Sequence, residues 1–251
     1  MDIWQKFDSE LTLWQQPIKF WWRDDDAIAD SDALQTMLTM AHDYAIAVHL
    51  AVIPNKLQDS LNVIKNAQHK ALSFVLQHGV EHKSFALADQ RKIELGGSQN
   101  SEQLVNKLAL GRQRLQQVFD EQYLDILVPP WNRISDDIVT ALPEIGYRQL
   151  SVLGGAKLVE TDFHLNVHID IINWKQRVFA GEDVILNNII DHLRNKRLGI
   201  DKSQKPCGLM THHLDHDQQC WQFLTKFFST CQQHRNIQWL SGNELLNHLQ
   251  Q

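Results

Sequence analysis

The feature of this sequence that most restricts its fold is a repeated order of short apolar run and amphipathic helix. Residues 18–22 (IKFWW), 46–53 (IAVHLAVI) and 123–128 (YLDILV) are typical of buried strands, and apolar residues at helical spacing follow each of them. Strands that alternate with helices pair in parallel, because a crossover helix is the usual route back to the same edge. About eight such strands predict a distorted (β/α) barrel of seven or eight parallel strands, with a doubly wound open sheet as the alternative.

The remaining elements are expected from the same two periodicities. Pro129 and Pro130 end the strand at 123–128, because proline cannot donate to a sheet ladder. The other predicted strands are 71–76, 147–153, 167–172, 207–212 and 237–240. The predicted helices are 31–41, 57–64, 104–119, 135–142, 184–193, 221–228 and one that begins at Ser241.

Composition narrows the class of protein. Hydrophobic residues make up 43% and charged residues 22% of 251 residues, which predicts one globular domain over 1–251. A net charge of -6 without a Lys/Arg block argues against nucleic acid and membrane partners, and no apolar run approaches a bilayer span. The amino terminus does not resemble a signal peptide, and three cysteines without a C-x-x-C pair fit reduced thiols. We therefore expect a cytoplasmic protein with a small-molecule or oligosaccharide substrate.

Polar residues cluster where the predicted strands end, and these ends share one mouth in parallel α/β folds. Three aspartates follow residues 18–22, two histidines four apart follow 71–76, and His212 and His213 follow the strand at 207. One carboxylate and two imidazoles are a sufficient ligand set for catalytic zinc, and one helical turn would place both histidines on the same side. The alternatives are a solvated acidic turn, and for residues 212–217 a polar loop or a second metal cluster.

The stretch HGVEH at residues 78–82 has a further interpretation. Read as H-x-x-E-H, it matches an inverted zinc-protease pattern with Glu81 as general base. That pattern needs a continuous helix, and Gly79 directly after a strand-like run disfavours one.

Taken together, these motifs resemble the polysaccharide deacetylase superfamily, metal-dependent enzymes on a distorted (β/α) barrel. In RDDDA, the resemblance implies Asp25 as the base and Asp26 as a metal ligand, with a register that uses Asp24 and Asp25 left open. HGVEH implies His78 and His82 as the other two ligands.

The remaining motifs of the family are matched with departures. VPPW has Val128 where an arginine that orients the catalytic aspartate is usual, so Arg23 or Arg133 would have to substitute. DIINW implies Asp170 and Trp174, with Asn173 in place of a second aspartate, and GLMTHH implies His212 as the acid, with His213 second.

The resemblance implies hydrolysis of a C–N amide bond, N-acetyl first, on a sugar or small amide. It implies a divalent metal as cofactor, zinc first, and a substrate site with these candidates: Trp131, Trp174, Arg133, Arg23, Pro130 and Asn132. A barrel that binds carbohydrate or metal without hydrolysis is the alternative function, and a metal-free structural barrel is a third.

Overall fold

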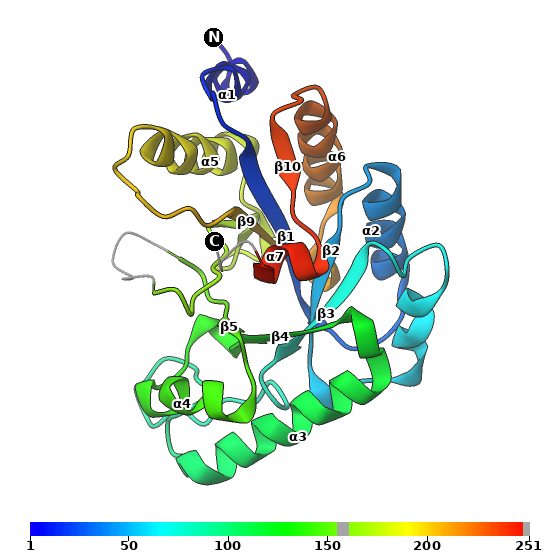
Figure 1. The fold of residues 1–251 in the computed structure, drawn as a ribbon, viewed down its shortest axis with the longest axis vertical. Coiled ribbons are helices and arrows are strands. Elements are labelled where there is room, and N and C mark those ends of the chain that lie inside the picture. The colour runs from blue at the N-terminus through cyan, green and yellow to red at the C-terminus, as the bar shows by residue number, and fades with distance from the viewer. Residues whose placement is uncertain (155–160, 248–251) are drawn as a thin grey trace.

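The computed structural model describes residues 1–154 and 161–247. Its centre is one sheet in which seven strands lie in the order β5-β4-β3-β2-β1-β9-β6, with β10 paired to the start of β1. Every pair in this sheet is parallel (Figure 1). The strands are β1 Ile18–Ala27, β2 Val48–Val52, β3 Ser73–His78, β4 Tyr123–Val128, β5 Gln149–Leu150, β6 Ile169–Asp170, β9 Cys207–Thr211 and β10 Ile237–Trp239. A separate antiparallel pair joins β7 (Ile172–Asn173) to β8 (Val178–Phe179).

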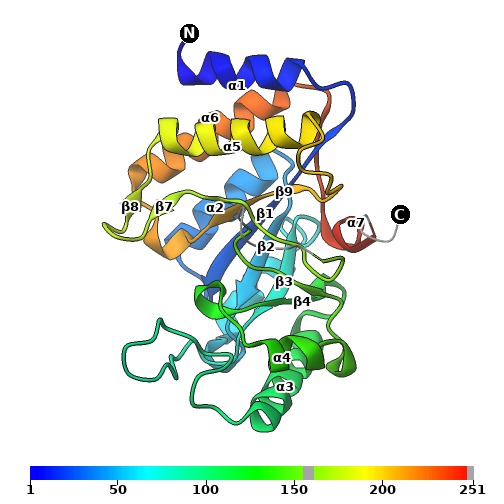
Figure 2. The same ribbon diagram turned by 90° about the vertical axis from the view of Figure 1, so that its left-hand side faces the viewer.

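Helices cover the outside of this sheet (Figures 1 and 2). Helices α1, α5 and α6 lie together at one end of the molecule, and α3 and α4 lie at the other. Glu10 and Arg197 join α1 to α5 by two bonds of 2.7 and 2.9 Å. The α-helices are α1 Ile3–Thr12, α2 Asp32–Asp43, α3 Ser101–Phe119, α4 Asp136–Ala141, α5 Glu182–Arg197, α6 Gln218–Gln232 and α7 Gly242–Asn247, and 3-10 turns occur at Pro54–Lys56, Asp59–Lys65, Asp120–Gln122, Pro130–Asn132, Pro143–Ile145 and His213–Asp215.

The sheet curls into a half-barrel whose interior is filled by side chains. Trp21, Leu76, Val128 and Met210 come from four different strands and belong to one buried apolar cluster. Within the described residues, the edge strands β5 and β6 do not pair with each other, and isolated bridges of residues 164–167 lie between them. The prediction of a distorted barrel is therefore confirmed, and the doubly wound sheet is not observed.

Side chains along β1 point alternately to the helices outside the sheet and to the interior of the half-barrel. Phe20 and Trp22 face the helices, where the Trp22 ring lies 5.0 Å from that of Phe228. Trp21 belongs to the interior cluster, and Arg23 follows on the same side because side chains two apart share one face of a strand. The first half of β1 therefore builds two apolar cores, and its second half brings charged groups to the carboxyl end.

Several predicted boundaries are wrong. We expected the first strand to end at Trp22, but β1 continues through the three aspartates to Ala27, because these charges are paired within the protein. The helix predicted for 57–64 consists of 3-10 turns, and Gln58, which precedes the second turn, gives no side-chain cap. The strand predicted for 147–153 shortens to Gln149–Leu150, since the chain then leaves β4 and bridges Val167 from Leu153.

Other predicted elements agree closely with the structure. The strand at 123–128 has the predicted bounds, and Ser31 caps α2 by accepting the Leu34 amide at 3.1 Å. Helix α1 was not predicted, although Asp2 and Gln5 form a capping box at its first turn. In the described part of the chain, none of the helices has the length and apolar character that a membrane span requires.

Candidate metal centre and active site

Three of the predicted metal ligands come together at the carboxyl end of the sheet. Asp26 Oδ1 lies 3.2 Å from His78 Nε2 and 3.3 Å from His82 Nε2. The register between β1 and β2 shifts between Asp24 and Ala27, and Asp26 is left-handed with φ of 72°. This irregularity turns the Asp26 carboxylate toward the histidines, away from the alternation of the strand. We call these three residues the carboxyl-end cluster.

The bonding of His78 suits a metal ligand. Its Nδ1 lies 3.0 Å from the Val128 carbonyl, which can only accept, so Nδ1 carries the proton of the neutral ring and Nε2 is the nitrogen that can bind either a second proton or a cation. The ring centres of His78 and His82 are 5.2 Å apart. A tetrahedral zinc with Zn–N bonds of about 2.1 Å holds two imidazole centres about 5 Å apart, so this pair fits a divalent cation.

The electrostatics of the cluster follow from burial and from mutual attraction. Burial opposes the charged form of Asp26, but the hydrogen bond and charge of His78, with the charge of His82, lower the pKa of Asp26 well below its usual value. Burial likewise opposes charge on His78, but the hydrogen bond to Asp26 and the charges of Asp25 and Asp26 outweigh it and raise the pKa of His78. The same atoms that attract protons here can attract a cation instead.

The two histidines are not joined by a helical turn, as their spacing had suggested. His78 is the last residue of β3, and the chain then turns through Gly79 with φ of 55° and His82 with φ of 53°. Left-handed residues at both positions end any helix there. The absence of a helix at 78–82 also removes the geometry that the protease interpretation requires.

Asp25 lies beside the carboxyl-end cluster and is held by Arg23. The Arg23 guanidinium donates from Nη2 to Asp25 Oδ2 at 2.9 Å, and its Nε lies 2.8 Å from Oδ1 as an ion pair without hydrogen-bond geometry. Arg23 is fully buried and also donates to Ser151 Oγ at 2.7 Å and to Asn132 Oδ1 at 3.1 Å. A charged hydrogen bond and a close ion pair to the same carboxylate restrict its orientation. Of the two arginines considered as substitutes for the one absent at Val128, Arg23 contacts Asp25, whereas Arg133 donates to the Lys92 carbonyl.

Asp24 faces the opposite side of β1. Its carboxylate accepts the Thr211 hydroxyl at 2.6 Å and the His213 amide at 2.9 Å, and its Oδ1 lies 2.5 Å from His213 Nδ1. Burial works against charge on His213, but the Asp24 carboxylate raises the pKa of His213 above its usual value. Asp24 and His213 thus form a buried ion pair apart from the carboxyl-end cluster.

His212 and Asp170 form the wall opposite β3. His212 Nε2 lies 3.9 Å from Asp25 Oδ2, and the His212 ring lies edge-on to the Trp174 ring at 4.5 Å. Asp170 accepts the Trp174 indole N–H at 2.7 Å. Burial raises the pKa of Asp170, and the charge of His212 partly offsets this.

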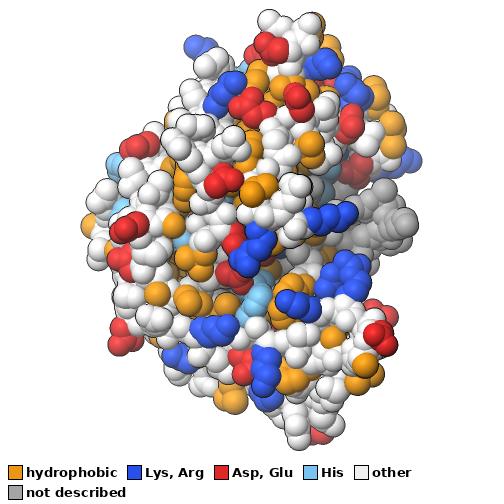
Figure 3. Space-filling model, turned by 180° about the vertical axis from the view of Figure 1, so that it is seen from behind, with side chains coloured by type: hydrophobic (Ala, Val, Ile, Leu, Met, Phe, Trp, Pro, Cys, Tyr) orange, Lys and Arg blue, Asp and Glu red, His pale blue; other side chains and the backbone are white. Residues whose placement is uncertain are grey.

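The turn of residues 130–133 forms the other side of the mouth. Trp131, with φ of 55°, lies 4.6 Å from the His82 ring, and Lys92 Nζ lies 5.7 Å from the Trp131 ring centre. Pro130 is buried, and the Arg133 Nη1 donates to the Lys92 carbonyl at 2.7 Å. On the face shown in Figure 3, Lys and Arg side chains gather around histidine and acidic surface near the centre.

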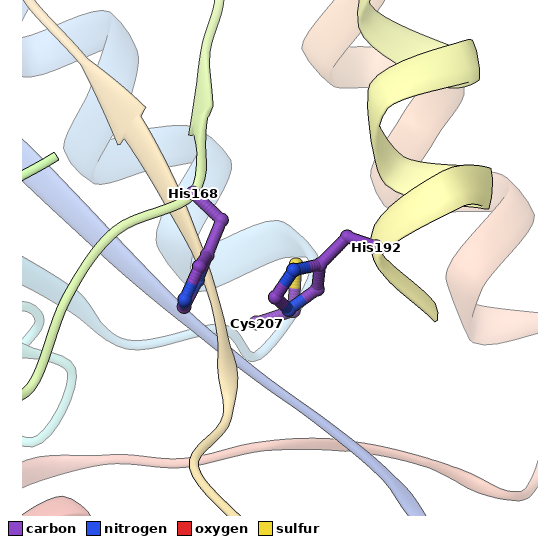
Figure 4. A group of neighbouring side chains, drawn as sticks. All are labelled: His168, His192 and Cys207. Atoms are coloured by element: carbon purple, nitrogen blue, oxygen red, sulfur yellow. The ribbon is translucent and has the colours of Figure 1, made fainter. Parts of the chain in front are cut away.

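A second group of possible ligands lies at the amino ends of the strands. His168 directly precedes β6, His192 lies on α5 and Cys207 begins β9, and their side chains converge in Figure 4. The two rings are 4.1 Å apart with a tilt of 34°, and His168 Nδ1 accepts the Gly208 amide at 3.0 Å. Burial raises the pKa of Cys207 to about 12. We call these three residues the amino-end cluster.

Residues 212–217 do not form a second metal cluster. His213 pairs with Asp24, Asp215 Oδ1 lies 2.5 Å from Arg177 Nη2, and Asp217 caps α6 by accepting the Cys220 amide at 2.9 Å. Sequence reasoning also missed Ser151 and Thr211. Both are small hydroxyl residues that no motif distinguishes, and only the sheet order places them beside Arg23 and Asp24.

Comparison with known proteins separates sequence from fold. No protein-family sequence model matches the chain, and no curated protein matches it. A Mycobacterium smegmatis protein assigned as a polysaccharide deacetylase has a TM-score of 0.62 at 14% identity, over 94% of this chain and 92% of that one. A family 4 carbohydrate esterase from Streptomyces lividans, in complex with acetate, has a TM-score of 0.56 at 11% identity, over 89% and 91%.

A third solved structure is a mutant of a CE4 family pseudoenzyme with restored enzymatic activity. It has a TM-score of 0.58 at 13% identity, over 93% of this chain and 69% of that one. These identities establish the fold alone, so the resemblance to polysaccharide deacetylases is confirmed at the level of the fold.

Proposed function

We propose that this chain is a single catalytic unit that uses a divalent metal, zinc first, to hydrolyse a C–N bond, N-acetyl first, of a sugar or small amide. The observation that carries the proposal is the carboxyl-end cluster, in which two imidazole Nε2 atoms face one oxygen of Asp26 at 3.2 and 3.3 Å. Asp25 and His212 lie directly beside it, and the shared fold of known deacetylases supports the same reaction class.

In this proposal, each residue beside the cluster has one task. A divalent cation held by Asp26, His78 and His82 supplies Lewis acidity toward the substrate carbonyl. Asp25 accepts a proton from the attacking water, and Arg23 keeps the Asp25 carboxylate in one orientation through one hydrogen bond and one ion-pair contact.

The opposite wall would serve the leaving group. His212 lies across the mouth from His78, and its Nε2 is 3.9 Å from Asp25 Oδ2. From this position, His212 gives a proton to the departing amine while Asp25 acts on the water. Trp174, which is 43% exposed, and Trp131 flank the two histidines His212 and His82 and offer apolar faces to a sugar ring.

The alternative function is a barrel that binds without hydrolysis, and the departures at Val128 and Asn173 favour it. The pair of Arg23 and Asp25 weakens that argument, because a guanidinium from β1 contacts the candidate base directly. We therefore favour the enzyme.

The test is a screen of zinc-loaded protein against N-acetylated sugars, chito-oligosaccharides and simple amides, with acetate and free amine as products. Asp25→Ala should lower kcat by about 10²–10⁴-fold and retain bound zinc. Asp125→Ala is the matched control, because Asp125 is a strand aspartate paired with Arg112 at 2.8 Å outside the site. Saturable binding without product across the panel would favour the non-enzyme, and wild-type turnover by Asp25→Ala would refute its role as base.

A further inference from the structure

A buried carboxylate lies against the turn that carries His78 and His82. Glu94 is 1% exposed, and its Oε1 accepts the Glu81 amide at 2.7 Å while its Oε2 accepts the Val80 amide at 3.2 Å. The backbone N–H of Lys83 also favours the charged form of this carboxylate. Hydrogen bonds from amides to a carboxylate are stronger than those between neutral groups. The turn is therefore folded around a single side chain from a segment more than ten residues later in the sequence.

The backbone of this turn leaves room for that carboxylate. Gly79 has φ of 55°, and a Cβ added there would overlap Glu94 Oε2 and lie 2.6 Å from Pro130 Cδ. A side chain at this position would therefore push the carboxylate out of place. Glycine at position 79 and glutamate at position 94 are matched to each other.

Glu94 is itself fixed by the other wall of the mouth. Leu95 forms a parallel bridge with Ile134, and its carbonyl accepts the Ser135 amide at 2.9 Å. Two residues before Glu94, the Lys92 carbonyl accepts from Arg133 at 2.7 Å. Glu94 thus connects the turn of residues 78–82 with the turn of residues 130–134.

We propose that Glu94 is a positioning residue of the metal centre, which holds the turn of residues 79–82 so that both imidazole Nε2 atoms face Asp26. This inference rests on the proposed function, since it concerns the same cluster. A ligand pair held in place before binding spares the cost of ordering the turn when the cation arrives. Partners that orient metal ligands typically change metal affinity by about 10–100-fold when they are removed.

The experiment measures zinc affinity by competition with a chromophoric chelator, on folded protein at matched concentration. Glu94→Gln puts an amide group where the carboxylate accepts backbone N–H groups, and Gly79→Ala displaces the carboxylate by overlap. Both variants should lose about 10–100-fold in zinc affinity, and Glu94→Asp, which keeps the charge, should recover part of it.

Two control variants separate positioning from general destabilisation. Glu10→Gln changes another buried glutamate, 4% exposed and paired with Arg197, far from the cluster. Gly199→Ala adds a methyl group at φ of 69°, where it would meet no described atom within 4 Å. Both controls should lose stability and keep wild-type zinc affinity.

The outcomes distinguish this inference from the proposed function. If wild-type protein binds zinc and Glu94→Gln binds it equally well, Glu94 is not a positioning residue and the metal centre stands. If Glu94→Gln does not fold, Gly79→Ala decides, and an affinity equal to that of Gly199→Ala would overturn the inference. A wild-type chain that binds no zinc would remove the metal centre itself, and with it both proposals.

Discussion

The carboxyl-end and amino-end clusters each bring three ligand atoms within 4.8 Å of one another, yet their bonding differs. In the carboxyl-end cluster, His78 donates its Nδ1 proton to a backbone carbonyl, which leaves Nε2 free to bind a cation. In the amino-end cluster, His168 Nδ1 accepts an amide proton, so Nε2 of the neutral ring carries the hydrogen. The distances between ring centres point to the same difference. The rings of His78 and His82 are 5.2 Å apart, which suits a shared ion, whereas those of His168 and His192 are 4.1 Å apart and stack with a tilt. Proximity alone therefore does not identify a metal site.

The two ends of the sheet also differ in charge. At the carboxyl end, the buried groups form ion pairs between Arg23 and Asp25 and between Asp24 and His213. Towards the amino end, burial favours neutral groups: it raises the pKa of Cys207 to about 12 and lowers the pKa of His49 to about 4. Charged pairs and neutral packing respond differently to mutation, to pH and to zinc, and this gives four tests.

The largest effect on stability is expected from Arg23→Met. This change keeps much of the side-chain volume and leaves the Asp25 carboxylate buried without its partner, which should cost about 3–5 kcal/mol. The matched change at the other end, Cys207→Ala, removes one buried sulfur atom and should cost about 1 kcal/mol. Urea unfolding measures both, and equal losses would show that the two ends are not built differently.

The loss of stability at acidic pH tests the neutral buried groups towards the amino ends of the strands, here His49. His49 Nδ1 lies 2.9 Å from the Trp22 carbonyl and its Nε2 accepts the Gly242 amide at 3.2 Å, so a second proton has no place. The unfolded chain binds that proton near pH 6.5 and the folded chain only at about pH 4, so stability is lost as pH falls from the first value to the second. The contribution is about 3 kcal/mol. His49→Gln should flatten this limb in urea titrations, and an unchanged acid limb would contradict the assignment.

The loss of stability at alkaline pH tests the buried ion pairs at the carboxyl ends of the strands, here the pair of Asp24 and His213. The raised pKa of His213 contributes stability that is fully present below pH 6.5 and is lost as pH rises through the folded value. His213→Gln should therefore weaken the protein most at acidic pH and reduce the alkaline decline to the part that His78 contributes. The same urea titrations measure this, and a decline that persists unchanged in the variant would assign it to another group.

The smallest effect concerns the thiol of the amino-end cluster. A metal ligand would be a thiolate, whereas burial keeps Cys207 protonated at neutral pH. Zinc should therefore change the alkylation rate of Cys207 by less than about twofold, as followed by peptide mass spectrometry. Strong protection by zinc would indicate that the amino-end cluster binds the ion.

The sequence predicted the fold best where one physical cause decides the structure. The strand at 123–128 is a mainly apolar run, interrupted by Asp125, that ends at Pro129, and the structure has the same bounds. The strand at 18–22 was predicted too short, because apolarity ends at Trp22 while pairing within the protein continues the strand to Ala27. Once β1 is extended, alternation places Arg23 and Asp25 on one face, as their contact requires.

The sequence indicated which residues form the carboxyl-end cluster, but not how the chain between them is folded or what holds it. The spacing of His78 and His82 suggested a helix, while the structure joins them by left-handed residues around Glu94. Glu94 belongs to an irregular segment without periodicity, so no pattern connects it to the turn before the chain folds. The roles of Asp25, His212 and the three ligands stay predictions.

The most direct test of the central claim is zinc bound per chain, measured by equilibrium dialysis and elemental analysis for wild type, His78→Ala and His192→Ala. One bound ion is expected in wild type and in His192→Ala, and His78→Ala should lose at least about 100-fold in zinc affinity. Zinc retained by His78→Ala and lost from His192→Ala would contradict the claim, because the ion would then lie at the amino ends of the strands.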